Sequence, residues 1–316
     1  MQTRIAVVGA GSFGRNHLRV LRQLDGADLT AVVDVHQQRA QEAAAQFSCE
    51  AVADVASLAG RVDAAIVATP TSTHAEIGRA LMESGIDVLV EKPIAHDLPS
   101  AERLVETAAK TGRILQVGHL ERFNPAVAAL RKMVTTPLFF EIHRLSLFSP
   151  RSLDVDVVLD LMIHDIDIVL ALTGKMPEEI RAAGISILSA KVDIANVRLA
   201  FSGGCVCNLT ASRVSTERVR KIRLFQPRQY LSLDYARQDL VAFEVGPERQ
   251  IGFQTAAVEK DEPLRLELAS FVRAVQDRSR PEATGEEGLR ALRVAMDIID
   301  KIEEHARVVA QSLERT

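Results

Sequence analysis

Residues 4–14 read Arg-Ile-Ala-Val-Val-Gly-Ala-Gly-Ser-Phe-Gly, and this stretch decides the fold of the first part of the chain. A short apolar run ends in a Gly-x-Gly-x-x-Gly pattern made by Gly9, Gly11 and Gly14. A strand, this turn and a following helix form the fingerprint of a dinucleotide-binding unit. Gly9 permits the tight turn, Gly11 lets the backbone approach a pyrophosphate, and Gly14 allows close packing of helix on strand.

Asp34 stands at the end of the second predicted strand, about 20 residues past the glycine motif. A carboxylate at this place accepts hydrogen bonds from the adenine-ribose hydroxyls and repels a 2′-phosphate. The sequence therefore favours NAD over NADP. Arg39 keeps NADP open, because a guanidinium so close can neutralise Asp34 or bind a phosphate.

The first third of the chain alternates β-rich apolar runs with helical stretches, which is typical of a parallel sheet covered by helices on both faces. The chain has 316 residues, enough for roughly two domains of about 150 residues. We predict a doubly wound α/β domain over residues 1–121. Its predicted strands are residues 4–8, 29–34, 64–69, 88–91 and 113–118.

The second part, residues 122–316, has a different pattern, in which a helix-like stretch at 126–134 is followed by alternating apolar and polar residues. The alternation on both sides of Gly203 and Gly204 predicts a β-hairpin. We expect an open, mainly antiparallel sheet with two closing helices. The predicted segments are strands at 197–201, 205–211, 222–225 and 231–235 and helices at 263–277 and 286–309.

Composition excludes several classes of protein. A net charge of -4 and a pI of 6.1 are far from the basic balance that nucleic-acid binding needs. Three cysteines are too few for a disulfide framework or a four-thiolate zinc site. The chain shows no signal-peptide core, and five ionisable residues interrupt its longest apolar region, 155–173, which argues against a membrane span. We expect a cytoplasmic protein without a metal.

Two further segments follow predicted parallel strands: residues 69–74, Thr-Pro-Thr-Ser-Thr-His, and residues 91–93, Glu-Lys-Pro. Ligands of open α/β sheets bind at the carboxyl ends of the strands. Lys92 at this edge, beside Glu91, is a candidate for proton transfer, although a plain surface lysine is an equally good interpretation of this residue alone.

Asp160 and His164 lie four residues apart in an apolar helical stretch, so they are expected to share one helix face. A carboxylate that fixes the tautomer of a histidine leaves its other ring nitrogen ready for acid–base chemistry. A buried structural histidine is the competing interpretation. A metal site made with Asp165 and Asp167 is disfavoured, because these residues do not share one face.

Together these motifs resemble those of the Gfo/Idh/MocA family of NAD(P)-dependent oxidoreductases. The resemblance extends to residues 117–125 and so covers nearly the whole chain. It implies a Rossmann domain, then an α/β domain with an open sheet that carries the substrate site and often an oligomer interface, in homodimers or homotetramers. It also implies a cis bond between Lys92 and Pro93.

The resemblance assigns roles to residues by motif position. Lys92 corresponds to the catalytic lysine, His164 to the acid/base histidine and Asp160 to its partner, and all three would also contact substrate. The implied contacts of the NAD cofactor are Gly9, Gly11, Ser12, Phe13, Gly14, Asp34, Thr69, Pro70, Thr71, His74, Glu91, Lys92 and His119.

Residues 118–125 and 149–160 resemble most closely the bacterial UDP-N-acetylglucosamine 3-dehydrogenases of this family. These enzymes oxidise the sugar 3-hydroxyl so that a partner aminotransferase can add an amine, for example in lipid A precursors. Guanidinium groups match phosphate oxygens, so arginines are candidate ligands of the substrate, although plain structural arginines are as good an interpretation. The candidates are Arg122, Arg144, Arg151 and Arg213.

Three other functions stay open at this point. The chain could oxidise a free sugar or polyol, it could be an NAD-dependent glycosidase that oxidises its substrate transiently, or it could be a non-catalytic NAD-binding regulator on the same fold. A regulator has no need of Lys92, Asp160 and His164 together, which favours an enzyme.

Overall fold

The computed structural model describes residues 2–148, 155–246 and 248–313. The chain divides into two compact units: unit 1 contains Met1–Phe123 and Asp261–Leu292, and unit 2 contains Asn124–Lys260 and Arg293–Thr316. Residues 261–292, which the sequence analysis assigned to the second domain, therefore pack with the first. Among the described residues, no helix combines the length and apolarity needed to cross a bilayer.

Unit 1 is built on a six-stranded sheet in the order β3-β2-β1-β4-β5-β6, and every pair is parallel. This order is the doubly wound arrangement, in which ligands bind where the strand order reverses, between β1 and β4. The expected α/β fold is confirmed, with one strand, β3, that the sequence analysis missed. The strands are β1 (Thr3–Val8), β2 (Ala27–Val33), β3 (Glu50–Val52), β4 (Ala64–Val67), β5 (Asp87–Glu91) and β6 (Leu115–Gly118).

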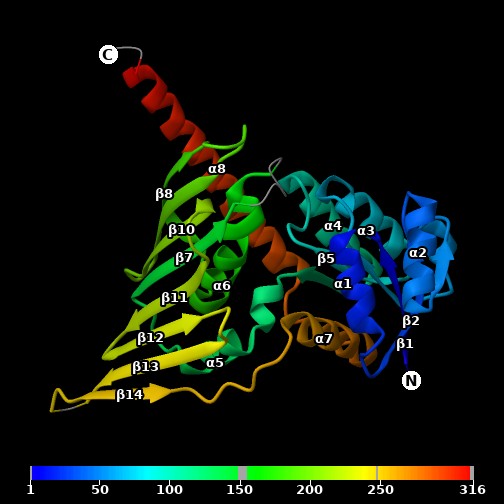
Figure 1. The fold of residues 1–316 in the computed structure, drawn as a ribbon, viewed down its shortest axis with the longest axis horizontal. Helices are drawn as coiled ribbons and strands as arrows, with labels where there is room; N and C mark the ends of the chain where they lie inside the picture. The colour runs from blue at the N-terminus through cyan, green and yellow to red at the C-terminus, as the bar shows by residue number, and fades with distance from the viewer. Residues whose placement is uncertain (1, 149–154, 247, 314–316) are drawn as a thin grey trace. The chain divides into compact units, whose positions relative to one another are not determined.

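Helices connect these strands, and a helix from far along the chain completes the unit (Figure 1). The core is continuous from β1 to α7, where Leu268 and Phe271 are fully buried. The strands are apolar almost throughout because both faces of the sheet are covered. The helices are α1 (Ser12–Leu21), α2 (Gln37–Phe47), α3 (His74–Glu83), α4 (Leu98–Thr111) and α7 (Pro263–Asp277), with 3-10 turns η1 (Ala56–Leu58), η2 (Thr71–Thr73) and η3 (Leu120–Phe123).

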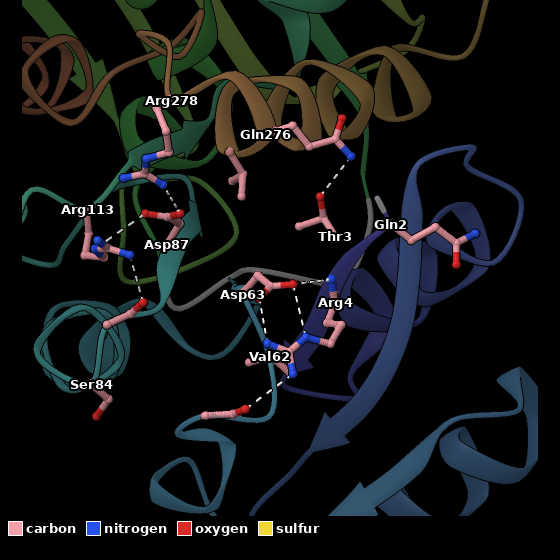
Figure 2. Close-up of a pocket in the computed structure, with 13 residues that line it drawn as sticks. Gln2, Thr3, Arg4, Val62, Asp63, Ser84, Asp87, Arg113, Gln276 and Arg278 are labelled. Atoms are coloured by element: carbon pink, nitrogen blue, oxygen red, sulfur yellow. Dashed lines mark hydrogen bonds and ion pairs between the residues drawn. The ribbon is translucent and has the colours of Figure 1, made fainter.

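A cavity of about 650 Å³ lies at the amino-terminal edge of this sheet, opposite the edge that carries the glycine turn. Figure 2 shows the ion pairs that line it. Asp87, which is buried at the start of β5, pairs with Arg278 and lies 4.0 Å from Nε of Arg113. The Asp87 carboxylate also accepts from the Ile114 N–H (2.8 Å). Asp87 thus ties the end of α7 to the sheet.

Replacing Asp87 with alanine is expected to lower the free energy of unfolding by about 3 kcal/mol, since a buried amide and two guanidinium groups lose a charged acceptor. Asp63 is the matched control, because its pair with Arg4 (2.7 Å) is 40% exposed on the carboxylate side. Asp63→Ala should cost at most about 1 kcal/mol. Urea denaturation measures both, and equal losses would contradict this ranking.

Unit 2 contains an eight-stranded sheet in the order β14-β13-β12-β11-β7-β10-β9-β8, drawn side by side in Figure 1. All of its pairs are antiparallel except β7 with β10. The mainly antiparallel sheet and the hairpin around Gly203 and Gly204 are confirmed. The strands are β7 (Phe139–Leu147), β8 (Pro177–Ile185), β9 (Ile194–Phe201), β10 (Val206–Ser215), β11 (Val219–Gln226), β12 (Gln229–Asp234), β13 (Asp239–Val245) and β14 (Ile251–Thr255).

Helices cover one face of this sheet (Figure 1), and buried residues alternate with more exposed ones along strands such as β9 and β11. They are α5 (Pro125–Met133), a π-helical turn η4 (Val158–Met162), α6 (Ile163–Thr173) and the later part of α8 (Gly285–Leu313). The side chain of Ile302 in α8 packs so closely on Gly184 of β8 that a Cβ there would lie 2.8 Å from it.

Candidate active site

The glycine turn has the close approaches that its sequence predicts. Gly9 has a φ of +101°, and a Cβ on Gly14 would lie 1.7 Å from the Gly9 carbonyl oxygen. A Cβ on Gly11, in contrast, would meet nothing within 4 Å. Gly9 and Gly14 are therefore required by the protein's own packing, whereas the space above Gly11 is open.

The start of α1 can receive an anion. Its N-cap is Gly11, and no side chain of the described part of the chain caps the first turn, to which Ser12 and Phe13 belong. Free amide groups at a helix start favour negative charge. A cavity of about 480 Å³ adjoins this turn, lined by Ala10, Gly11, Ser12, Arg15, His36, Gln38, Arg39 and Glu42.

Asp34 is turned toward this loop. Its carboxylate accepts from the Ala10 N–H (2.8 Å) and from the His36 N–H (2.8 Å), and Arg39 Nη1 lies 3.5 Å from it. These two hydrogen bonds from backbone N–H groups hold the Asp34 carboxylate in place beside the cavity. Each oxygen retains a second lone pair that can accept from a ribose hydroxyl.

The segment after β4 and the segment after β5 are joined by His74. Its Nδ1 lies 2.9 Å from the Pro93 carbonyl oxygen and its Nε2 lies 2.9 Å from the Thr69 carbonyl oxygen. Burial lowers the pKa of His74, despite the bonds to both carbonyls. The Lys92–Pro93 bond is cis, as the family resemblance implies.

Glu91 is held directly behind Lys92. Its Oε1 lies 2.7 Å from His17 Nε2, and its Oε2 accepts from the Lys92 N–H (3.2 Å). Burial by itself would raise the pKa of Glu91, but the hydrogen bond and charge of His17, with the charge of Lys92, outweigh it and lower that pKa. Glu91 therefore serves as an ionised anchor for the backbone of Lys92.

A second buried carboxyl, Glu267 on α7, lies in the same unit. Burial first, and then the charge of Glu91, raise the pKa of Glu267 well above its ordinary value. Its backbone carbonyl faces Gln116 Nε2 (3.5 Å). Two carboxyls in one apolar environment cannot both ionise cheaply, so Glu91 carries the charge and Glu267 keeps its proton.

Glu267→Gln is expected to stabilise the protein at neutral pH and to leave it unchanged near pH 4. An acid whose pKa is raised by folding contributes stability below its unfolded pKa of about 4.3, and this contribution is lost as the pH rises toward the folded pKa. The glutamine side chain cannot ionise, so the variant should lack this loss of stability with rising pH. Chemical denaturation between pH 4 and 9 measures it, and parallel curves for both proteins would contradict a protonated Glu267.

In unit 2 the helical stretch expected around Asp160 and His164 is present, and it opens with a π turn before the α-helix. Asp160 lies in the π turn η4, where the Ile163 N–H donates to the Val158 carbonyl five residues back, and His164 lies in the first turn of α6. The wider turn still keeps residues four apart on the same side of the helix. Within the described ranges, no three His, Cys, Asp or Glu side chains gather to hold a metal ion.

The arginines that were candidate ligands of the substrate already have hydrogen-bond partners within the protein. Arg122 donates to Glu287 Oε2 (2.8 Å) and to the Glu282 carbonyl (2.9 Å), and both partners lie in unit 1. Arg144, only 2% exposed, donates to both oxygens of Asp165.

Arg213 is buried as well and donates to the Val155 carbonyl oxygen. Arg151 lies outside the described residues. Burial and existing partners thus remove Arg122, Arg144 and Arg213 as ready ligands of a diphosphate.

Comparison with known proteins decides the family. An oxidoreductase family model with an NAD-binding Rossmann fold matches residues 3–119, and the model of the GFO/IDH/MocA C-terminal domain matches residues 144–228. A UDP-N-acetylglucosamine 3-dehydrogenase from Acidithiobacillus ferrooxidans is 35% identical over 301 residues, which are 93% of this chain and 96% of that protein. The chain belongs to the Gfo/Idh/MocA family.

Other members are similar along their whole length. The solved structure of the Acidithiobacillus ferrooxidans enzyme superposes with a TM-score of 0.92 at 34% identity and covers 96% of this chain and 99% of that one. A myo-inositol 2-dehydrogenase from Thermotoga maritima is 28% identical over 96% of this chain and 98% of its own. This Gfo/Idh/MocA protein is therefore an oxidoreductase, and its relatives in the family are named as dehydrogenases.

The residues of unit 1 fit the NAD of the Gfo/Idh/MocA family. The cradle above Gly11, the open amides of α1 and the carboxylate of Asp34 suit a pyrophosphate and a ribose. Glu91, Lys92, the loop from Thr69 to His74 and the buried His119 all lie at or just after the carboxyl ends of β4, β5 and β6.

Two residues of this site, His17 and Glu267, were not predicted from the sequence. The position of each in its helix could have marked it. His17 follows Gly14 by three residues and so lies on the same face of α1. Glu267 interrupts the apolar stripe that Leu268, Phe271 and Val275 form on α7. An acid within an apolar helix face is rare unless it is paired or protonated.

Proposed function

We propose that the protein oxidises the 3-hydroxyl of UDP-N-acetylglucosamine with NAD. The observation that carries this proposal is the similarity to a UDP-N-acetylglucosamine 3-dehydrogenase over 93% of the chain, with a TM-score of 0.92 between the structures. NAD would accept the hydride from C3 of the sugar at C4 of its nicotinamide ring. The other products are the 3-keto sugar nucleotide and one proton.

The chain's own residues would bind, orient and move that proton. Lys92 and His164 are the proposed proton acceptors for the sugar hydroxyl, and Asp160 would hold His164 in one tautomer and stabilise its protonated form. Glu91 and His17 support this role for Lys92, because they fix its backbone. The proposed NAD contacts are Gly9, Gly11, Ser12, Phe13, Gly14, Asp34, Thr69, Pro70, Thr71, His74, Glu91, Lys92 and His119.

Absorbance of NADH at 340 nm tests the proposal. Purified protein is mixed with NAD and with UDP-N-acetylglucosamine, UDP-N-acetylgalactosamine, N-acetylglucosamine, myo-inositol or UDP alone, and an aminotransferase with glutamate removes the ketone. The proposal expects reduction with UDP-N-acetylglucosamine in clear excess over the others. Reduction with myo-inositol alone would favour a polyol dehydrogenase, to which other relatives point, and binding of NAD without reduction of it would favour a regulator.

A ketone at C3 is a substrate for transamination, so the proposal includes a partner aminotransferase and a place in the supply of lipid A precursors. We also propose a cytoplasmic location for the protein. Its cysteines are free thiols, as is usual in a reducing compartment: Cys49, Cys205 and Cys207.

Self-association through the outer face of the unit 2 sheet is the last part of the proposal. Stacked or tilted rings cross five strands there, with centroids 4.8 to 5.7 Å apart: Phe139, Phe225, Tyr230, Phe243 and Phe253. Phe253 is 65% exposed and Ile251 74% exposed. An apolar strip of this kind on a sheet face suits a second copy of the same surface.

Light scattering should therefore give two or four times the chain mass of 34.5 kDa. Phe225→Glu, within the strip, should yield monomers that bind NAD normally, because the proposed NAD contacts belong to unit 1. A wild-type monomer, or an unchanged mass for this variant, would contradict the proposed interface.

A further inference from the structure

Apolar packing alone does not fix the rotation of α6 about its own axis. Ile163 and every residue from Asp165 to Leu170 are buried, and apart from Asp165 and Asp167 these are apolar side chains, which point to all sides of the helix. The hydrophobic effect has no direction, and a helix that is apolar all round loses little buried area when it turns about its axis. Something else must fix the direction in which His164, in its first turn, points.

Two buried side chains, those of Arg144 and Tyr235, meet at the carboxylate of Asp165, the residue next to His164. Arg144 of β7 donates from Nε (2.7 Å) and Nη2 (2.8 Å) to the two carboxylate oxygens. Tyr235, just after β12, donates from its hydroxyl to Oδ1 (3.1 Å), and its ring lies 4.8 Å from the Arg144 guanidinium carbon. We call Arg144, Asp165 and Tyr235 the Asp165 cluster.

The cluster is anchored on the sheet at two points. Arg144 stands on the central strand β7, between β10 and β11, and the Tyr235 carbonyl accepts from Asn124 Nδ2 (3.1 Å) at the start of α5. A two-pronged bond to a planar guanidinium has a defined direction as well as strength. The cluster therefore resists rotation of α6, which apolar contacts do not.

The turn before α6 makes such resistance necessary. η4 contains a π-type bond from Ile163 back to Val158, which holds one residue more than an α-turn. Release of that extra residue would advance the helix by one position and swing His164 by about 100° around the axis. Asp165 is the first buried polar residue after this point, and such a shift would break all three of its hydrogen bonds.

We propose that the Asp165 cluster is a register lock, which fixes the rotation of α6 and so positions the His164 side chain for proton transfer. This inference rests on the proposed function for the role of His164. Its members are positioning residues, and Arg144 takes this role in place of the phosphate contact expected from sequence. Buried polar groups that set register at a cost in stability have precedent in coiled coils.

The test replaces the cluster by apolar residues of similar volume, Arg144→Met/Asp165→Leu/Tyr235→Phe. Such replacements of a buried ion pair are often neutral or stabilising, so the melting temperature should not fall. The turnover number with UDP-N-acetylglucosamine should drop by about 10²-fold, as misplacement of a catalytic group by about 1 Å costs. The dissociation constant of NAD should stay unchanged.

Addition of His164→Ala separates positioning from a general structural effect. In the wild type this change should cost about 10²- to 10⁴-fold in turnover. The triple variant with His164→Ala should lose no more turnover than His164→Ala alone, because effects that act through one group are not additive. Phe140→Leu, a core change on β7, is the control, and there the two losses should multiply. Wild-type turnover in the triple variant, or losses that multiply, would overturn the lock.

A second readout needs no substrate. Nitrogen-15 spectra of the histidine rings, with His164 assigned from a His164→Gln sample, should show its signal shifted or broadened in the triple variant and that of His74 unchanged. If wild-type protein fails to oxidise UDP-N-acetylglucosamine, the proposed function falls and this spectrum still decides the lock. An unchanged His164 signal would overturn it. If the triple variant does not fold, Arg144→Lys, which keeps the charge and loses the fork, carries both tests.

Discussion

Lys92→Ala and His164→Ala should each lower turnover by about 10²- to 10⁴-fold, the range typical of general acid–base groups, with a much smaller change in NAD affinity. The hydroxyl proton must leave as the hydride does, so without an acceptor the carbon would lose hydride from an alcohol rather than from a developing alkoxide. NAD affinity persists because the cradle of Gly9 to Gly14 and Asp34 is intact in both variants.

Stopped-flow reduction of NAD measures turnover. Calorimetry measures NAD affinity, because a chain without tryptophan has too little fluorescence for a quenching titration. Lys110→Ala is the control, since its side chain is 78% exposed on α4. Full activity of both the Lys92 and the His164 variant would remove these residues from the chemistry. A loss of NAD affinity equal to the loss of turnover would give Lys92 a binding role only.

Gly14→Ala should abolish NAD binding and lower stability as well, whereas Gly11→Ala should affect NAD binding alone. A Cβ on Gly14 would lie 1.7 Å from the Gly9 carbonyl oxygen, a backbone atom that moves only if the whole turn moves. A Cβ on Gly11 would meet nothing within 4 Å among the residues that the structure describes, and it would intrude where a pyrophosphate is proposed to lie.

Calorimetric titration with NAD and thermal melting of the free protein separate the two effects. Both variants should lose at least about 100-fold in affinity, equivalent to about 2.7 kcal/mol, but only Gly14→Ala should melt several degrees lower. Wild-type affinity in Gly11→Ala would mean that the pyrophosphate does not approach this turn.

Much of the fold followed from local pattern. The helix predicted at 263–277 has the bounds of α7, because Pro263 opens it and an apolar stripe runs its length. Five strands were not predicted from the sequence: β3, β7, β8, β13 and β14. Two of them, β3 and β14, show why. β3 has only three residues, too few to show a period, and β14 is exposed on every residue, so it carries no alternation.

The site was predictable where one residue's chemistry depends on backbone shape, and less so where it depends on a distant partner. Gly9 and Gly14 are required by contacts a few residues away or across one strand. Arg144 and Asp165 are 21 residues apart, and nothing local reveals that they pair in the interior. An arginine in a strand therefore looks the same in sequence whether it binds phosphate or locks a helix.

In the proposed reaction the hydride leaves C3 of UDP-N-acetylglucosamine, so a deuterium label at that carbon should be transferred to NAD. Protein, NAD and the 3-deuterated sugar nucleotide are incubated with the aminotransferase, and the mass of the NADH is measured. The NADH should be heavier by one mass unit with this substrate and should have its ordinary mass with the 2- or 4-deuterated sugar nucleotide. Unlabelled NADH from the 3-deuterated substrate, or labelled NADH from either of the others, would contradict it.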